Sequence, residues 1–209
     1  MRYLLIALAM LSAKLQSEEI VYKSEREKKV THSTWKIDKK KPIIAIVGTD
    51  GKETTKIECT SNKGFLSYTE FKDDEETLKI SRENDRLIAE KQEHRKEYHI
   101  GNTPWIQDFA FGLWSFLESA DTSYKFCIVN TYKLDMHKMV ATKHEVKTVT
   151  VNGTEYDIRI VNVTLQGFQK NMWKAELWYN VKSNDLIRYK ANEGPFTPIT
   201  ITSLVSKKT

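Results

Sequence analysis

The sequence contains little of what defines several common protein classes. Its 209 residues include two cysteines, eight glycines and four prolines. Cys59 and Cys127 are too far apart in the chain to form a redox motif, and two cysteines alone do not make a metal site. No low-complexity tract, internal repeat or Pro/Gly/Ser-rich linker interrupts the chain. These absences favour a single folded domain.

Sequence motifs of enzymes are also missing. There is no G-x-S-x-G nucleophile motif. The stretch GTDGKETT lacks the spacing of a phosphate-binding loop, because Gly48 and Gly51 stand too close together and Glu53 follows Lys52. The five histidines include no pair with a third ligand at a metal-site spacing. We therefore expect no catalytic residue, no metal, no cofactor and a non-enzymatic role.

Charges of both signs alternate along the chain, as in KSEREKK, FKDDEE and EKQEHRKEY. Mixed-sign charge usually marks a solvated face. The formal net charge is +5, and it falls to +3 without residues 1–17, which contain Arg2, Lys14 and no acid (5 − 2 = 3). Nucleic-acid binders usually concentrate lysine and arginine on one face. We therefore expect no nucleic-acid partner.

No hydrophobic run in the sequence is long. The longest starts after Arg2 and covers Tyr3 to Leu11, about half of the roughly 20 residues that span a bilayer. Small residues follow, and cleavage after either Ala13 or Ser17 fits the pattern of a secretory signal peptide. The alternative is an N-terminal helix. We predict a signal peptide over 1–17 and an exported, periplasmic domain over 18–209, extracellular in a cell without an outer membrane, with no transmembrane segment.

Most of the mature chain has the pattern of short β-strands. Strand-forming segments recur about every ten residues, and turn signals such as Asp50-Gly51 and Asn152-Gly153 separate them. Regular short strands of this kind favour an antiparallel sheet that curves. We predict a mainly β fold, an antiparallel half-barrel or incompletely closed barrel of roughly ten strands.

Residues 104–118 break the β pattern. Thr103 is a candidate N-cap, and Pro104 suits the first position of a helix. Apolar residues cover most of the circumference of this segment, which predicts a buried central helix. Gly112 costs about 1 kcal/mol relative to Ala inside a helix, and its presence suggests a close backbone contact. We expect this helix to lie in the concave side of the half-barrel.

The aromatic residues suggest a ligand cavity beside that helix, because a barrel of this size can enclose one apolar ligand. The candidate cavity residues are Trp105, Phe109, Leu113, Trp114, Leu117, Trp173 and Tyr179. The expected ligand is a lipid or acyl chain. The non-enzymatic role expected here is to bind or carry this ligand, or to support the cell envelope through an envelope protein as partner. Two alternatives remain: a protein-interaction module with a fully packed core, and an enzyme with no recognisable motif.

The two cysteines leave two interpretations open. In an oxidising compartment Cys59 and Cys127 can form a disulfide. Free cysteine also behaves as a small hydrophobic residue, so both can be buried thiols.

The stretch WKAELWYNVKSNDLIRYKANEG, residues 173–194, predicts a hairpin. Trp173, Leu177 and Tyr179 alternate with charged residues and are expected to face the core, whereas Trp178 lies on the charged face. Arg188, on the paired strand, is expected to cover Trp178 through a cation–π contact worth about 0.5–1 kcal/mol.

The order of these segments resembles a family of exported bacterial β-rich proteins of unknown function. The resemblance rests on PWIQDFAFGLWSFLES, YKFCIVN, VTVNGTEYDIRIV and the late pattern that ends in NDLIRY. Its pattern residues here are Asp108, Trp178, Asp185 and Arg188. The architecture is also similar to the half-barrels of periplasmic lipoprotein carriers, which implies an apolar concave surface for acyl chains. The chain differs from them in its high charge and in lacking a cysteine for a lipid anchor.

Overall fold

A computed structural model describes residues 17–39, 43–60, 64–151, 153–192 and 197–208. The predicted signal peptide, 1–17, lies outside these residues except for Ser17, the first residue of β1. In the described residues no helix has the length and apolar character needed to cross a membrane.

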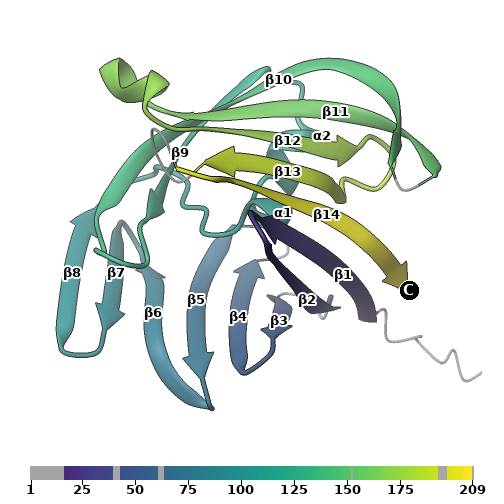
Figure 1. Ribbon diagram of the computed structural model, residues 1–209. Coiled ribbons are helices and arrows are strands. Elements are labelled where there is room, and N and C mark those ends of the chain that lie inside the picture. Colours follow the sequence, from purple (N-terminus) through teal and green to yellow (C-terminus); the bar gives the residue numbers. More distant parts are fainter. Residues whose placement is uncertain (1–16, 40–42, 61–63, 152, 193–196, 209) are drawn as a thin grey trace, which may run out of the picture.

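One antiparallel sheet of 14 strands forms almost the whole fold (Figure 1). The strands are β1 (Ser17–Arg26), β2 (Lys29–Asp38), β3 (Ile43–Asp50), β4 (Glu53–Thr60), β5 (Phe65–Lys72), β6 (Glu75–Glu83), β7 (Arg86–Lys91), β8 (His94–His99), β9 (Ser123–Val129), β10 (Met136–Val151), β11 (Thr154–Leu165), β12 (Lys174–Asn180), β13 (Leu186–Asn192) and β14 (Ile199–Lys208). Their order in the sheet runs from β8 down to β1, then from β14 down to β9. The predicted fold class, an incompletely closed antiparallel barrel, is confirmed.

The strands are more numerous than the roughly ten expected, because some turns use residues that do not signal a turn. Residues 20–37 contain neither glycine nor proline, yet Glu27 takes a φ of 52° and starts the turn between β1 and β2. Gln92, with a φ of 53°, similarly separates β7 from β8. By contrast, Gly51 has a φ of 62° in the turn between β3 and β4, as the Asp-Gly signal predicts.

The central helix is present but shorter than 104–118. It consists of α1 (Phe109–Gly112) and α2 (Trp114–Glu118), which follow one another inside the curved sheet (Figure 1). Asp108, not Thr103, is the N-cap, and its carboxylate accepts a hydrogen bond from the Ala110 N–H at 2.7 Å. The residues before Asp108 extend along β9, where the Pro104 carbonyl accepts a hydrogen bond from the Cys127 N–H. Pro104 therefore belongs to an extended segment and does not start a helix.

The two outer strands of the sheet, β8 and β9, are joined by side chains and loops instead of a strand ladder. The extended segment 104–106 bonds to the free edge of β9 through Cys127. Arg82, in β6, donates to the carbonyls of Gly101 and Thr103 at 2.8 and 3.1 Å. Tyr98, in β8, donates to the Leu134 carbonyl in the β9–β10 turn. These contacts bridge the seam between β8 and β9, where no strand ladder closes the barrel.

The hydrophobic core lies between the concave face of the sheet and the two short helices. Alternate residues of many strands supply it, as in β12, where Ala175, Leu177 and Tyr179 are buried and the residues between them are not. Gly112 lies within this core: a Cβ atom built there would stand 2.3 Å from Cγ2 of Ile106. The close backbone contact suggested for Gly112 is therefore present.

Candidate ligand-binding pocket

The predicted cavity residues form a packed aromatic core and reach two surface pockets. Trp105, Leu113, Trp114 and Tyr179 are buried. The Tyr179 hydroxyl donates to the Phe109 carbonyl at 2.6 Å, which fixes β12 to the start of α1. These residues pack against one another, and the space that a ligand could enter lies further along the concave face. Only two of the seven predicted residues, Leu117 and Trp173, line either of these two surface pockets.

An apolar pocket of about 750 Å³ opens at one end of the concave face. We call it the rim pocket. Its walls are Ile128, Val129, Met139, Leu165, Met172 and Trp173, and its edge is formed by Asn130, Thr131, Tyr132 and His137. This volume falls within the range of about 300–1,000 Å³ that is usual for small-molecule sites. The mixture of an apolar wall and a few polar groups at the edge is also typical of such sites.

Strand register places three of the wall residues, Ile128, Met139 and Leu165, on the inner side of the sheet. In β9 and β10, Ile128 stands opposite His137, and in β10 and β11, Met139 stands opposite Leu165. Directly paired residues point to the same face of a sheet. Met139 belongs to the buried core, so this shared face is the concave one. The rim pocket thus continues the hydrophobic core to the surface.

Trp173 forms the boundary between the rim pocket and the core. Its ring lies 6.2 Å from that of Phe109, which also lies 6.2 Å from Phe126 and from Tyr189. Aromatic pairs at such separations add about 0.5–1.5 kcal/mol beyond the burial of their area. Phe109 therefore packs behind Trp173 and does not line the rim pocket. Of the residues predicted to line a cavity, Trp173 is the one that a ligand in the rim pocket would contact.

The turn after β9 holds the edge of the pocket in a fixed shape. The Asn130 side chain accepts bonds from the N–H groups of Tyr132 and Lys133, both at 2.9 Å. Leu134 is buried with a φ of 58°. Lys91 donates to the Thr131 carbonyl at 2.8 Å, and its ammonium lies 5.4 Å from the centre of the Tyr132 ring. Tyr132, which is 80% exposed, is thus presented by a well-bonded turn.

A second, polar pocket of about 850 Å³ lies near the end of α2. Leu117 lines it together with charged residues of both signs, including Lys143, Arg159 and Glu176. Lys143 donates to the Ser119 carbonyl at 2.7 Å and lies 4.4 Å from the centre of the Phe116 ring. Burial and the nearby Arg159 charge lower the pKa of Lys143. Its charged lining makes this pocket a weaker candidate for an apolar ligand.

Asp108 is a half-buried ionisable group at the start of α1. Burial raises the pKa of Asp108 to about 6, although backbone N–H groups of Ala110 and Phe111 oppose the shift. Its negative charge contributes to the raised pKa values of Tyr22, Tyr68 and Tyr179, after burial as the main cause. A helix N-terminus stabilises a carboxylate, but here the loss of hydration outweighs that effect.

The other pattern residues have structural contacts. Asp185 is 8% exposed and accepts two bonds from Lys207, at 2.8 and 3.0 Å. Lys207 also lies 3.2 Å from Glu18, so the pair ties β13 and β14 to β1. Trp178 stands opposite Arg188, whose guanidinium lies 4.9 Å from the indole centre. The cation–π contact predicted from the sequence is confirmed.

Cys59 and Cys127 are free, buried thiols, so the disulfide interpretation does not hold in this structure. Burial, with smaller contributions from Asp108 and Glu58, raises the pKa of Cys59 to about 12. Burial also raises the pKa of Cys127 to about 11. In the described residues no group of three or more His, Cys, Asp or Glu side chains could hold a metal ion.

The sequence pointed to the helix and missed the strands that form the rim pocket. Ile128, Met139 and Leu165 line it from three adjacent strands. A signal was present, since the apolar residues at alternate positions in YKFCIVN and YDIRIVNVTL mark one face of each strand. The register between the strands, which brings these faces together, cannot be read from the strands one at a time.

No family model matches the chain, and no curated protein matches it. Among solved structures it is similar to the β-barrel-like protein of domain of unknown function DUF1849 from Brucella abortus, at 8% identity and a TM-score of 0.58, over 93% of this chain and 98% of that one. This similarity confirms the predicted fold, that of a β-rich domain of unknown function.

Two further structures are more distant. The hypothetical lipoprotein YmcC from Escherichia coli matches at 6% identity and a TM-score of 0.40, over 91% of this chain and 86% of that one. The lipoprotein LppX from Mycobacterium tuberculosis matches at 10% identity and a TM-score of 0.27, over 92% and 86%. These scores are too low to support a shared function, so the fold assignment rests on the Brucella structure.

Proposed function

We propose that the chain is an exported, non-enzymatic protein that binds a hydrophobic ligand with an acyl chain in the rim pocket. The observation that carries the proposal is the apolar wall of this pocket, which runs from the surface to Trp173 and the aromatic core behind it. An acyl chain there would cover half-buried Ile128 and Leu165, and such burial is favourable by about 25 cal/mol per Å² of apolar area. The leader-like residues 1–17 support export.

Ligand binding is tested by displacement of a fluorescent fatty acid from the purified protein in solution, and by mass spectrometry of lipids that co-purify with it. Ile128→Lys places a charge in the wall of the rim pocket and should abolish displacement while the far-ultraviolet circular dichroism stays unchanged. Ile160→Lys is the matched control, because Ile160 is half-buried and lines the polar pocket instead. That control should retain binding.

The proposal is wrong if the unmodified protein neither binds the fatty acid nor carries lipid. It is also wrong if both isoleucine variants lose binding equally, because the effect would then not belong to the rim pocket. In either case the packed core beside α1 and α2 would favour the alternative, a protein-interaction module.

A further inference from the structure

The mouth of the rim pocket has exposed apolar groups on two sides. Tyr132 is 80% exposed and Met172 is 50% exposed, and both line the same pocket. Tyr132 comes from the β9–β10 turn, whereas Met172 follows η1 (Gly167–Asn171), the short helical turn between β11 and β12. Exposed apolar groups that frame a pocket often mark an interaction surface. Tyrosine in particular is enriched where a protein meets the interface of a bilayer.

Positive charge is concentrated around this mouth. The two segments that form it, 130–139 and 165–174, contain four lysines and one acid, a net charge of +3 (4 − 1) with histidine neutral. The whole of 18–209 also carries a net charge of +3 (5 − 2). The rest of the mature chain is therefore balanced, and these 20 residues hold its entire excess (10 + 10). The lysines are Lys133, Lys138, Lys170 and Lys174.

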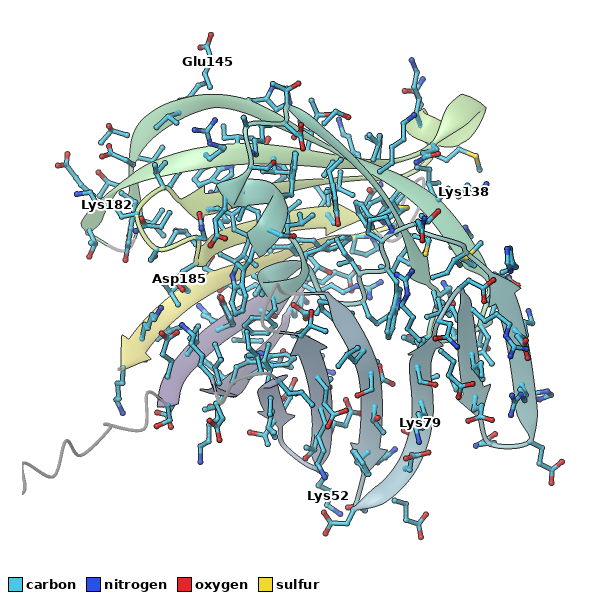
Figure 2. The ribbon with its side chains drawn as sticks, turned by 180° about the vertical axis from the view of Figure 1, so that it is seen from behind. Lys52, Lys79, Lys138, Glu145, Lys182 and Asp185 are labelled. Carbon is cyan, nitrogen blue, oxygen red and sulfur yellow. The ribbon has the colours of Figure 1, made fainter. Side chains whose placement is uncertain are left out.

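Little of this charge is neutralised locally. The one acid of the two segments, Asp135, is paired with Lys96 of β8 at 2.7 Å. Lys133 and Lys170 are exposed, and neither forms an ion pair with any residue that the structure describes. Figure 2 shows Lys138 at the same end of the molecule as η1, with Lys182 at the opposite end. Cations and exposed apolar groups thus share one end of the barrel.

We propose that this mouth surface, made of Tyr132, Lys133, Lys170 and Met172, docks onto an anionic lipid surface. The two apolar side chains enter the interface, and the lysines contact the lipid head groups. Each lysine near an anionic membrane surface contributes about 1 kcal/mol, or about fivefold in affinity. Docking there would place the opening of the rim pocket against lipid, and in this respect the inference builds on the proposed function.

The chain contains its own control for this surface. The turn between β12 and β13 repeats the geometry of the β9–β10 turn. Asn180 accepts bonds from the N–H groups of Lys182 and Ser183, as Asn130 does in the other turn. Asn184 has a φ of 57°, which matches the 58° of Leu134. This second turn presents Val181, 41% exposed, and Lys182 at the far end of the molecule.

The test is flotation of the purified protein with vesicles of phosphatidylcholine alone or mixed with phosphatidylglycerol. The protein should bind the mixed vesicles and should not bind vesicles of phosphatidylcholine alone. Binding to the mixed vesicles should weaken as the salt concentration rises. The double variant Lys133→Glu/Lys170→Glu should reduce binding at least about tenfold. Tyr132→Ser/Met172→Ser should also reduce it, whereas Lys182→Glu and Val181→Ser should not.

Docking and ligand binding can fail separately. The docking variants should still bind the fluorescent fatty acid in vesicle-free solution, and Ile128→Lys should still float with anionic vesicles. Equal binding to both vesicle types, no binding to either, or an equal loss with Lys182→Glu would overturn the docking proposal. An acidic protein partner would then be the alternative occupant of the mouth.

Discussion

At the scale of single residues, the pKa of a carboxyl group rises where burial removes its hydration and falls where a nearby cation stabilises its charge. Asp108 caps α1 and still has a pKa raised to about 6 by burial. Asp135, whose side chain is 48% exposed, has its pKa lowered by its hydrogen bond and charge contact with Lys96. The two aspartates therefore shift in opposite directions, and the protein should show both effects as pH changes.

The Asp108→Asn variant tests the buried carboxyl. The folded state binds this proton more tightly than the unfolded state, whose pKa is about 3.9. The Asp108 contribution to stability is therefore present below about pH 4 and is lost as pH rises to about 6. Asparagine caps a helix about as well as aspartate. Relative to the unmodified protein, the variant should gain up to about 3 kcal/mol in unfolding free energy over this range.

Urea denaturation at several pH values measures this difference. Asp135→Asn is the control, and its stability relative to the unmodified protein should instead fall as pH rises, because the lost carboxylate was stabilised in its charged form. A stability difference for Asp108→Asn that does not change with pH would show that Asp108 is not buried as described.

Among single residues, contacts within a hairpin could be predicted and contacts across the fold could not. The Trp178–Arg188 contact follows from two alternating strands joined by a polar turn, so the sequence was sufficient for it. The partner of Asp185 is Lys207, two strands apart in the chain, and no local pattern links them. Phe109 was predicted to line the cavity, but it supports Trp173 from behind. The burial of Phe109 depends on the residue at which the helix begins.

At the scale of elements, the central helical segment is the most constrained part of the chain. Asp108 starts it, and Gly112 ends α1 where Ile106 and Phe65 leave no space. The sequence indicated that a helix interrupts the strands and that Gly112 marks a close contact. It did not indicate that residues before Asp108 extend along β9, because helical spacing and Pro104 favoured an earlier start.

Gly112→Ala should destabilise the protein even though alanine favours a helix by about 1 kcal/mol. The added methyl group would stand 2.3 Å from Cγ2 of Ile106, a buried side chain with little room to move. Overpacking of this kind costs about 1–3 kcal/mol, and thermal denaturation measures it. Ile106→Ala removes Cγ2, so in a double-mutant cycle the losses caused by Gly112→Ala and Ile106→Ala should be less than additive. Additive losses would place the strain elsewhere.

The turns fall into two groups, those that a sequence signal predicts and those that no such signal predicts. Asp50-Gly51 was readable because glycine adopts a positive φ without cost. Glu27 and Gln92 adopt positive φ values that such residues seldom take, so two hairpins were merged into single strands. The charge alternation along the chain likewise concealed the excess of lysine at the mouth, which emerges once segments 130–139 and 165–174 are brought together.

At the scale of the whole molecule, the two cysteines report on the integrity of the barrel. Both are at most 2% exposed, and burial raises both pKa values. Since the thiolate is the reactive form, a thiol reagent should modify neither cysteine in the native protein at neutral pH. Both should react after unfolding in urea. Cys127 lies on β9 at the seam, so partial opening of the seam should expose it before Cys59, as mass spectrometry of modified peptides would show.

A substitution of Arg82 tests whether its hydrogen bonds hold the seam. Arg82→Ala removes the bonds that hold Gly101 and Thr103 and should speed the modification of Cys127 more than that of Cys59. Equal acceleration at both cysteines would indicate global unfolding, and no acceleration would show that Arg82 does not hold the seam.

The strand order also bears on how the chain acquires its shape. Within the described strands every ladder joins sequence neighbours except that of β1 with β14, where Glu19 pairs with Lys208. β1 to β8 and β9 to β14 can therefore each form as a meander from local hairpins, which close quickly because their loops are short. Pairing β1 with β14 joins the two ends of the chain and carries the largest loop-closure entropy. Folding should thus end when β1 pairs with β14 and joins the two meanders. The two meanders, made as separate fragments, should associate through this ladder.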